Sequence, residues 1–203
     1  MSIIKTHDKY LYGKTDKYNI ILEPLCDDHL NLLYKWCADS EVLYWTEGGE
    51  DIVRSYDKET VHEIYGGISK NNFCFLINAN DIPIGECWLQ RMNIEYVKEM
   101  YQDNMDVRRI DMAIGEKEYW NKGIGTELIK ILVDFAFQTE RVDILHCLCE
   151  DYNIRSKRIW EKNDFRLVLQ EKLAQPQRGK FQCHYRLTKD EYFKNIELFP
   201  KLA

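Results

Sequence analysis

Two glycines stand where a polar segment changes into an apolar-periodic helix, in the stretch EYWNKGIGTELIKILVDFAF, residues 118–137. A Gly123-x-Gly125 loop before a helix leaves first-turn N–H groups exposed at the positive end of the helix dipole. Without a Cβ, the loop lets a diphosphate approach the backbone closely. The pattern predicts a phosphate site, and the alternative is that the glycines only form a tight turn.

Two common phosphate loops do not fit this pattern. A dinucleotide fingerprint requires a third glycine three residues after the second, and Leu128 stands there. A Walker loop requires Gly-Lys-Ser/Thr, and Thr126-Glu127 follows Gly125. The loop therefore belongs to neither class.

The flanking elements must position this loop between a strand and a helix. Apolar periodicity and turn residues predict the order β-α-α-β-β-β-α-β-α-β-β, which favours a mixed α/β sheet with helices on both faces. Asp27 or Asp28 is the expected N-cap of the first helix, and Thr188 and Glu191 form a capping-box pattern. The expected strands are 18–24, 73–78, 84–92, 107–115, 143–149, 165–172 and 181–187, and the expected helices are 27–38, 57–70, 124–137, 153–163 and 188–203.

Composition indicates one soluble domain, 1–203, with an N-terminal extension over 1–17 and the C-terminal helix. There is no membrane-length apolar run and no secretory signal, so we expect a cytoplasmic protein with seven reduced cysteines. The net charge of −6 argues against nucleic acid. No second Cys/His pair accompanies Cys147 and Cys149, so no metal is expected. His146 is expected to be a packed strand histidine.

The segments RRIDMAIGEKEYWNKGIGTELIK and NIRSKRIWEKNDF resemble the two coenzyme A motifs of the GNAT acetyltransferases. ILEPLCDDHLNLLYKWCADSEVLYWTEGG and IPIGECWLQ further resemble aminoglycoside 6'-N-acetyltransferases. The resemblance spans residues 18–187. It implies a mostly antiparallel mixed sheet with two splayed parallel strands, here 107–115 and 143–149.

The resemblance also implies acetyl-CoA as co-substrate and places it. N–H groups from Asn121 to Thr126, through Lys122, Gly123, Ile124 and Gly125, would hold the diphosphate. Met112, Ala113 and Ile114 would pair with the pantetheine arm, and Asn153 would contact it. Arg155, Lys157 and Arg158 would add positive charge for the phosphates. The alternative is that two or more of these three are ordinary solvated helix residues.

Acetyl transfer requires a neutral amine, and the resemblance assigns proton removal to Asp111. The alternative is a strand carboxylate paired with Arg108 or Arg109. An oxyanion donor is expected from a bulged strand. The expected substrate contacts are Trp45, Glu47, Glu86, Asp111 and Glu150. Glu50 and Asp51 belong to the same acidic loop as Trp45 and Glu47. The alternative is that this loop is only an exposed acidic loop.

Three positions depart from the family pattern. Trp120 replaces a frequent Gln or Arg, Trp160 replaces a Tyr that protonates the coenzyme thiolate, and Leu148 replaces an antibiotic-binding Asp. An indole N–H donates a hydrogen bond but does not transfer a proton. The alternatives are another amine acceptor, such as a protein N-terminus, a lysine or a siderophore precursor, or a non-catalytic acyl-CoA-binding module. The oligomeric state is not readable from the sequence.

Overall fold

The computed structural model describes residues 2–46, 55–174 and 178–198. One eight-stranded sheet runs through them in the order β1-β2-β3-β4-β5-β6-β8-β7, and all neighbours are antiparallel except the β5–β6 pair. The strands are β1 (Leu11–Lys14), β2 (Asn19–Pro24), β3 (Phe73–Ala79), β4 (Ile82–Arg91), β5 (Val107–Ile114), β6 (Ile144–Glu150), β7 (Arg166–Lys172) and β8 (Phe181–Thr188). The expected mixed, mostly antiparallel α/β sheet is confirmed.

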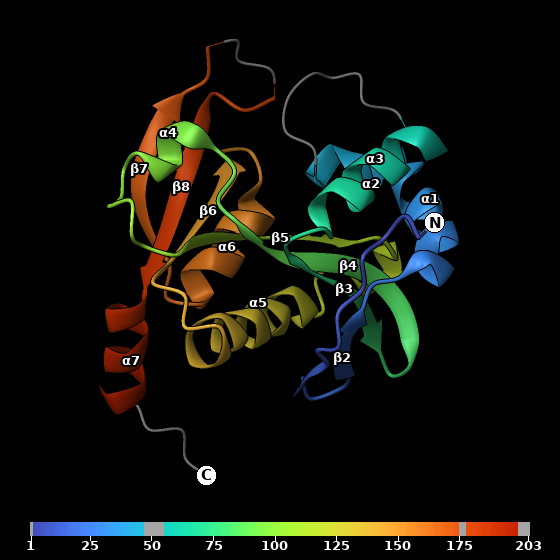
Figure 1. The fold of residues 1–203 in the computed structure, drawn as a ribbon, viewed down its shortest axis with the longest axis horizontal. Coiled ribbons are helices and arrows are strands. Elements are labelled where there is room, and N and C mark those ends of the chain that lie inside the picture. The colour runs from blue at the N-terminus through green and yellow to red at the C-terminus, as the bar shows by residue number, and fades with distance from the viewer. Residues whose placement is uncertain (1, 47–54, 175–177, 199–203) are drawn as a thin grey trace.

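Helices cover both faces of this sheet. Figure 1 shows α1, α2 and α3 gathered beside one half of the sheet, and α7 projecting below β8. The helices are α1 (Leu30–Cys37), α2 (Ser40–Thr46), α3 (Lys58–Ile68), α4 (Glu95–Lys98), α5 (Ile124–Asp134), α6 (Ile154–Lys162) and α7 (Lys189–Leu198). None of the helices in the described ranges is long and apolar enough to cross a bilayer.

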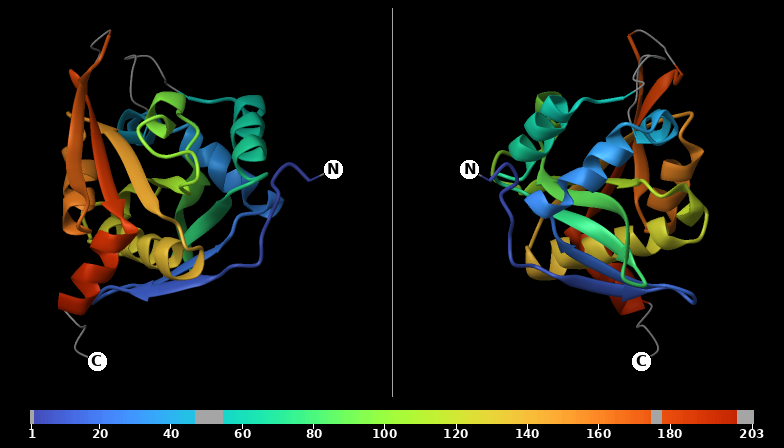
Figure 2. Two further views of the ribbon diagram at one scale, coloured as in Figure 1. Left: turned by 60° about the vertical axis from the view of Figure 1, so that its left-hand side comes forward. Right: turned by 90° about the vertical axis from the view of Figure 1, so that its right-hand side faces the viewer.

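The main core lies between the sheet and α5. Ile124, Leu128 and Leu132 recur at helical spacing and are fully buried. Burying each such side chain contributes roughly 1.5–3 kcal/mol of transfer free energy, so this face anchors the helix. Figure 2 shows α5 lying across the sheet in both views. After Asp134 the helix continues as a wider π-type turn over Phe135–Thr139.

The helix termini confirm one sequence prediction and correct another. Thr188 Oγ1 accepts the Glu191 N–H and the Glu191 carboxylate accepts the Thr188 N–H, which is the expected capping box. Asp27 does not cap the first helix. Its carboxylate instead accepts the N–H groups of Ile3 and Ile4, and the chain turns into the helix at Cys26. The sequence pattern could not show this because the partners lie 23 and 24 residues away.

A pair of histidines is buried under α4. His146 and His184 are 0% exposed, which confirms that His146 packs inside the sheet. Their rings meet at 2.9 Å between His146 Nε2 and His184 Nδ1, and His146 Nδ1 lies 2.5 Å from the Tyr101 hydroxyl. Burial, reinforced by the neighbouring His184 and Arg186, lowers the pKa of His146 to about 4. The pair is therefore neutral at physiological pH.

Candidate functional site

The sheet opens between β5 and β6. These two parallel strands pair only at Val107–Ile144 and Arg108–Leu145 and then separate. At the point of separation the Ile110 N–H donates to Cys147 Sγ at 3.4 Å, so a sulfur replaces the next carbonyl acceptor. A cavity of about 710 Å³ occupies the opening. The expected pair of splayed strands is confirmed.

The glycine loop forms one end of this cavity. Gly123 caps α5 in the left-handed conformation, with φ of 80°, and Asn121 is also left-handed, with φ of 59°. A Cβ on Gly125 would meet Met112 Cε at 3.1 Å and Ile159 Cδ1 at 3.0 Å, so the loop is packed closely. The first-turn N–H groups of Ile124 and Gly125 have no acceptor within the helix. This is the arrangement that binds a phosphate.

The predicted loop residues do not all face the cavity. Asn121, Lys122, Gly123, Gly125 and Thr126 line it, whereas the Ile124 side chain is fully buried in the core. The Thr126 N–H donates to the Gly123 carbonyl at 3.1 Å, so it closes the turn instead of pointing at a ligand. Ile124 can therefore contribute only its backbone N–H to a phosphate site, and not its side chain.

Four cations from the loop and from α6 line the cavity, namely Lys122, Arg155, Arg158 and Lys162, whereas Lys157 does not. The Arg155 guanidinium lies between two indoles, 4.4 Å from the Trp45 ring centre and 4.8 Å from that of Trp120. Such stacking fixes a cation that would otherwise be mobile. Sequence reasoning placed Arg155 near phosphate but missed its two aromatic partners, whose only signal was their proximity to the motifs.

Asn153 connects α6 to α2. Its Oδ1 accepts the Ser156 N–H and so caps α6, and its Nδ2 donates to the Trp45 carbonyl at 2.9 Å. Nearby, the Tyr152 hydroxyl donates to the Tyr44 carbonyl at 2.8 Å. The Asn153 side chain is thus engaged at both ends, although the residue lines the cavity as expected.

The opposite wall is the open edge of β5. Met112, Ala113 and Ile114 line the cavity. Because the Ile110 N–H points into the gap, strand alternation turns the backbone groups of Met112 and Ile114 the same way. The Ile114 carbonyl accepts the Trp120 indole N–H at 2.7 Å. The expected bulge is not seen in β5, since its register with β4 is continuous from Gly85–Ile114 to Arg91–Arg108.

Asp111 lies on this wall and already has partners. Its carboxylate accepts Trp88 Nε1 at 2.9 Å, Gln90 Nε2 at 2.8 Å, and two N–H groups of Arg109 at 2.7 and 2.5 Å. Three of these donors contact Oδ2 and one, Arg109 Nη2, contacts Oδ1, whereas each carboxylate oxygen offers about two lone-pair sites. The pairing with Arg109 that the sequence left open is therefore present.

A second carboxylate faces the same side. Val107 and Ile144 are paired, so alternate residues from each, including Asp111 and Glu150, project from one face of the sheet. Glu150 is 8% exposed, lines the cavity, and accepts the Gly179 N–H at 3.1 Å. It lies two residues beyond Leu148, where the family pattern has its aspartate, so the acidic group is displaced along the same face.

One of the predicted substrate contacts is not brought to the cavity, and another lies outside the described residues. Glu86 is 4% exposed and lies beneath α3, where it interacts with the Tyr65 hydroxyl. Burial, and then the Glu86 carboxylate, raise the pKa of that tyrosine. Glu47 lies outside the described residues, as do Glu50 and Asp51. Trp45, at the end of α2, does line the cavity.

Trp160 and Cys149 form the floor beneath α6. Burial raises the pKa of the Cys149 thiol to about 12, and the neighbouring Ser156 and Trp160 side chains act in the opposite direction. Cys149 is therefore a neutral thiol at physiological pH. No cluster of three His, Cys, Asp or Glu side chains in the described part of the chain is arranged to hold a metal ion.

One protein family and several known proteins are similar to this chain. The family model described as "Acetyltransferase (GNAT) domain" matches residues 19–166. The aminoglycoside N(6')-acetyltransferase type 1 of Klebsiella pneumoniae is 22% identical over 160 residues, which cover 77% of this chain and 79% of that protein.

Two solved structures share the fold. Aminoglycoside acetyltransferase AAC(6')-Ib in complex with coenzyme A superposes with a TM-score of 0.70 at 21% identity, covering 86% of this chain and 98% of that one. Spermidine N-acetyltransferase from Vibrio cholerae, in complex with CoA and spermine, gives 0.66 at 16% identity, covering 86% and 98%. At these identities the likeness concerns the fold.

Proposed function

Because the chain belongs to the GNAT acetyltransferase family, we propose that it transfers the acetyl group of acetyl-CoA to a primary amine of a cationic small molecule. The first candidate is the 6'-amine of an aminoglycoside. The observation that carries the proposal is a single cavity with a phosphate-binding loop at one end and two carboxylates, Asp111 and Glu150, on the face beside it.

The residues at the coenzyme end suit acetyl-CoA. The exposed backbone of the Gly123–Gly125 loop fits a diphosphate, and Lys122, Arg155 and Arg158 balance its charge. The open edge at Met112 offers backbone groups to an amide-containing arm, as an added strand would use them. Bound there, acetyl-CoA supplies the activated acyl group.

The carboxylates suit the acceptor. An alkylamine with a pKa near 10.4 is about one part in 2,500 neutral at pH 7, which costs roughly 4–5 kcal/mol. A carboxylate beside the amine binds its ammonium form and takes up the proton. In this proposal Glu150 binds the cation. The substrate ammonium and the Arg109 guanidinium are both cations, so the ammonium can replace Arg109 at the Asp111 carboxylate. Asp111 then accepts the proton of the ammonium.

The departing thiolate needs a hydrogen-bond donor. Trp160 is positioned near Cys149 on the cavity floor and offers only an N–H. In this proposal Trp160 stabilises the sulfur anion, and the proton comes from solvent. Because an indole stands in place of a hydroxyl, we expect that the titration of a tyrosine does not change the rate of coenzyme release.

The direct test follows thiol release from acetyl-CoA with kanamycin or tobramycin. We expect turnover, and we expect Asp111→Asn to lower kcat about 10²–10⁴-fold with little change in KM for acetyl-CoA. Glu150→Gln should mainly raise KM for the amine. Asp8→Asn is the matched control, because Asp8 is a fully exposed carboxylate outside the cavity.

The same assay separates the alternatives. A panel containing spermine, a peptide with a free N-terminus and lysine tests other amines. Turnover only with spermine would replace the aminoglycoside with a linear polyamine. Binding of acetyl-CoA in calorimetry without turnover on any amine would indicate a binding module, and no binding would refute the proposal.

A further inference from the structure

The outer strand β7 carries an unusual apolar edge. It ends the sheet order beyond β8, and all seven of its residues are exposed. Leu167, Val168 and Leu169 are 45%, 38% and 39% exposed in succession. Figure 1 shows β7 at the outer side of the sheet. An edge strand with consecutive exposed apolar residues is a template for pairing with another strand.

A bulge in β7 sets which residues share a face. The register with β8 shifts between Leu167 and Leu169, so Val168 is an extra residue. Arg166 lies opposite Arg186, and Glu171 lies opposite Gln182. Arg186 and Gln182 are four residues apart on β8 and therefore share a face. Arg166 and Glu171 consequently project from the same face, although Glu171 follows Arg166 by five positions, an odd offset that would place them on opposite faces of a regular strand.

We propose that β7 pairs antiparallel with β7 of a second copy of this chain, about a two-fold axis between Val168 and Leu169. In this register Arg166 lies opposite Glu171 of the second copy, and Leu167 lies opposite Gln170. The bulge matters here, because only it lets residues at this spacing meet on one face. The two sheets then become continuous, and the three apolar side chains are covered.

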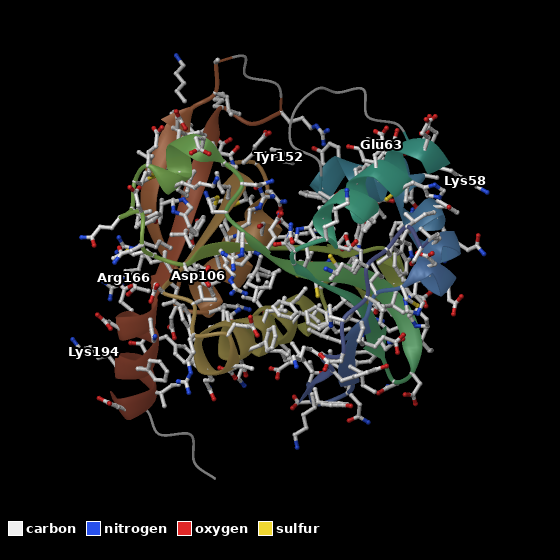
Figure 3. The ribbon with its side chains drawn as sticks, viewed as in Figure 1. Lys58, Glu63, Asp106, Tyr152, Arg166 and Lys194 are labelled. Carbon is white, nitrogen blue, oxygen red and sulfur yellow. The ribbon has the colours of Figure 1, made fainter. Side chains whose placement is uncertain are left out.

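Charge complementarity identifies the second copy as the occupant. Arg166 begins the strand and Glu171 stands near its other end, before Lys172, so reversal about the two-fold axis brings Arg166 and Glu171 together twice. Both groups are accessible, because the side chain of Arg166 is 70% exposed and that of Glu171 is 52% exposed. Within the chain Arg166 lies 3.5 Å from Glu191 and Glu171 lies 3.7 Å from the His184 ring, so each would share its charge between that neighbour and the second copy. Figure 3 shows Arg166 at the outer side of the molecule.

Charge reversal gives a sharp test by sedimentation velocity over a dilution series. The wild-type chain should dimerise as concentration rises. Arg166→Glu and Glu171→Arg should each weaken the dimer at least about tenfold, because each replaces two attractive pairs with two repulsive pairs. Mixing the two single variants should restore pairing as a heterodimer, and the double variant should self-associate again.

Lys194→Glu is the matched control, because Lys194 is an exposed residue of α7 outside β7. It should leave the dimer unchanged. The restoration on mixing guards against misfolding, since an unfolded variant would not rescue its counterpart. A wild-type chain that stays monomeric at every concentration overturns the proposal. A dimer that tolerates both single reversals also overturns it, because the two copies would then meet elsewhere.

Discussion

Acidification should destabilise this protein through His146, and the loss can be calculated. The native pKa is lowered from 6.5 to about 4 because the ring is buried beside His184 and Arg186. Between these values the unfolded chain binds a proton that the native state does not. The contribution of neutral His146 to the free energy of unfolding is therefore fully present above about pH 7, and it decreases as the pH falls towards 4.

Linkage gives the size of the effect. At pH 5, the difference between the two pKa values costs about 2 kcal/mol of unfolding free energy relative to pH 8. The pKa of His184 is lowered in the same direction, mainly by burial, so it adds to the loss. The facing groups Tyr101, Arg186 and Glu171 remain in both the wild type and a His146 variant.

The assay is urea denaturation of the wild type and His146→Gln at pH 8 and pH 5. Carboxylate titration affects both proteins equally, so the difference between them isolates the histidine. We expect the variant to start less stable at pH 8, since it loses the contacts with Tyr101 and His184, but to lose about 2 kcal/mol less on acidification. An identical pH-dependent loss in both proteins would refute the reasoning.

Three further predictions concern the loop, the arginine stack and a buried ion pair. Gly123→Ala should lower the free energy of unfolding by about 1–2 kcal/mol, because Gly123 has a left-handed backbone, and it should raise KM for acetyl-CoA. The control Gly67→Ala lies in a helix with open space around it and should be neutral or stabilising in thermal melts. Arg155→Met should shift tryptophan fluorescence and weaken coenzyme binding in calorimetry, and an unchanged spectrum would contradict the stack. Arg108→Leu should destabilise the fold by about 3–5 kcal/mol in urea denaturation, because the Asp106 and Glu140 carboxylates lose the guanidinium that pairs with both of them.

The sequence predicted elements whose signals are local. Apolar periodicity placed α5 within a few residues, and the Thr188 capping box placed the start of α7. It missed α2 and α4, which are short and lack a long apolar stripe. The N-cap prediction failed at Asp27 because a distant backbone segment binds that carboxylate.

The site shows the same division. The glycine pattern and the family resemblance indicated the glycine loop and Asp111, and both line one cavity. Spacing carried no information on Trp88 and Gln90, the two donors to the Asp111 carboxylate that come from β4. It also could not show that Glu86 lies beneath α3, because strand alternation gives a face but not what covers that face.

The stacking of Arg155 between Trp45 and Trp120 has a consequence for engineering this scaffold. In the proposed function Trp45 belongs to the acceptor side and Trp120 to the coenzyme side, and Arg155 contacts both, so the two specificities would not be separable modules. Grafting a foreign segment over residues 40–46 would remove a support of the phosphate-facing arginine. Chimeras designed to change the acceptor should therefore retain an aromatic ring at position 45, or lose coenzyme affinity with it.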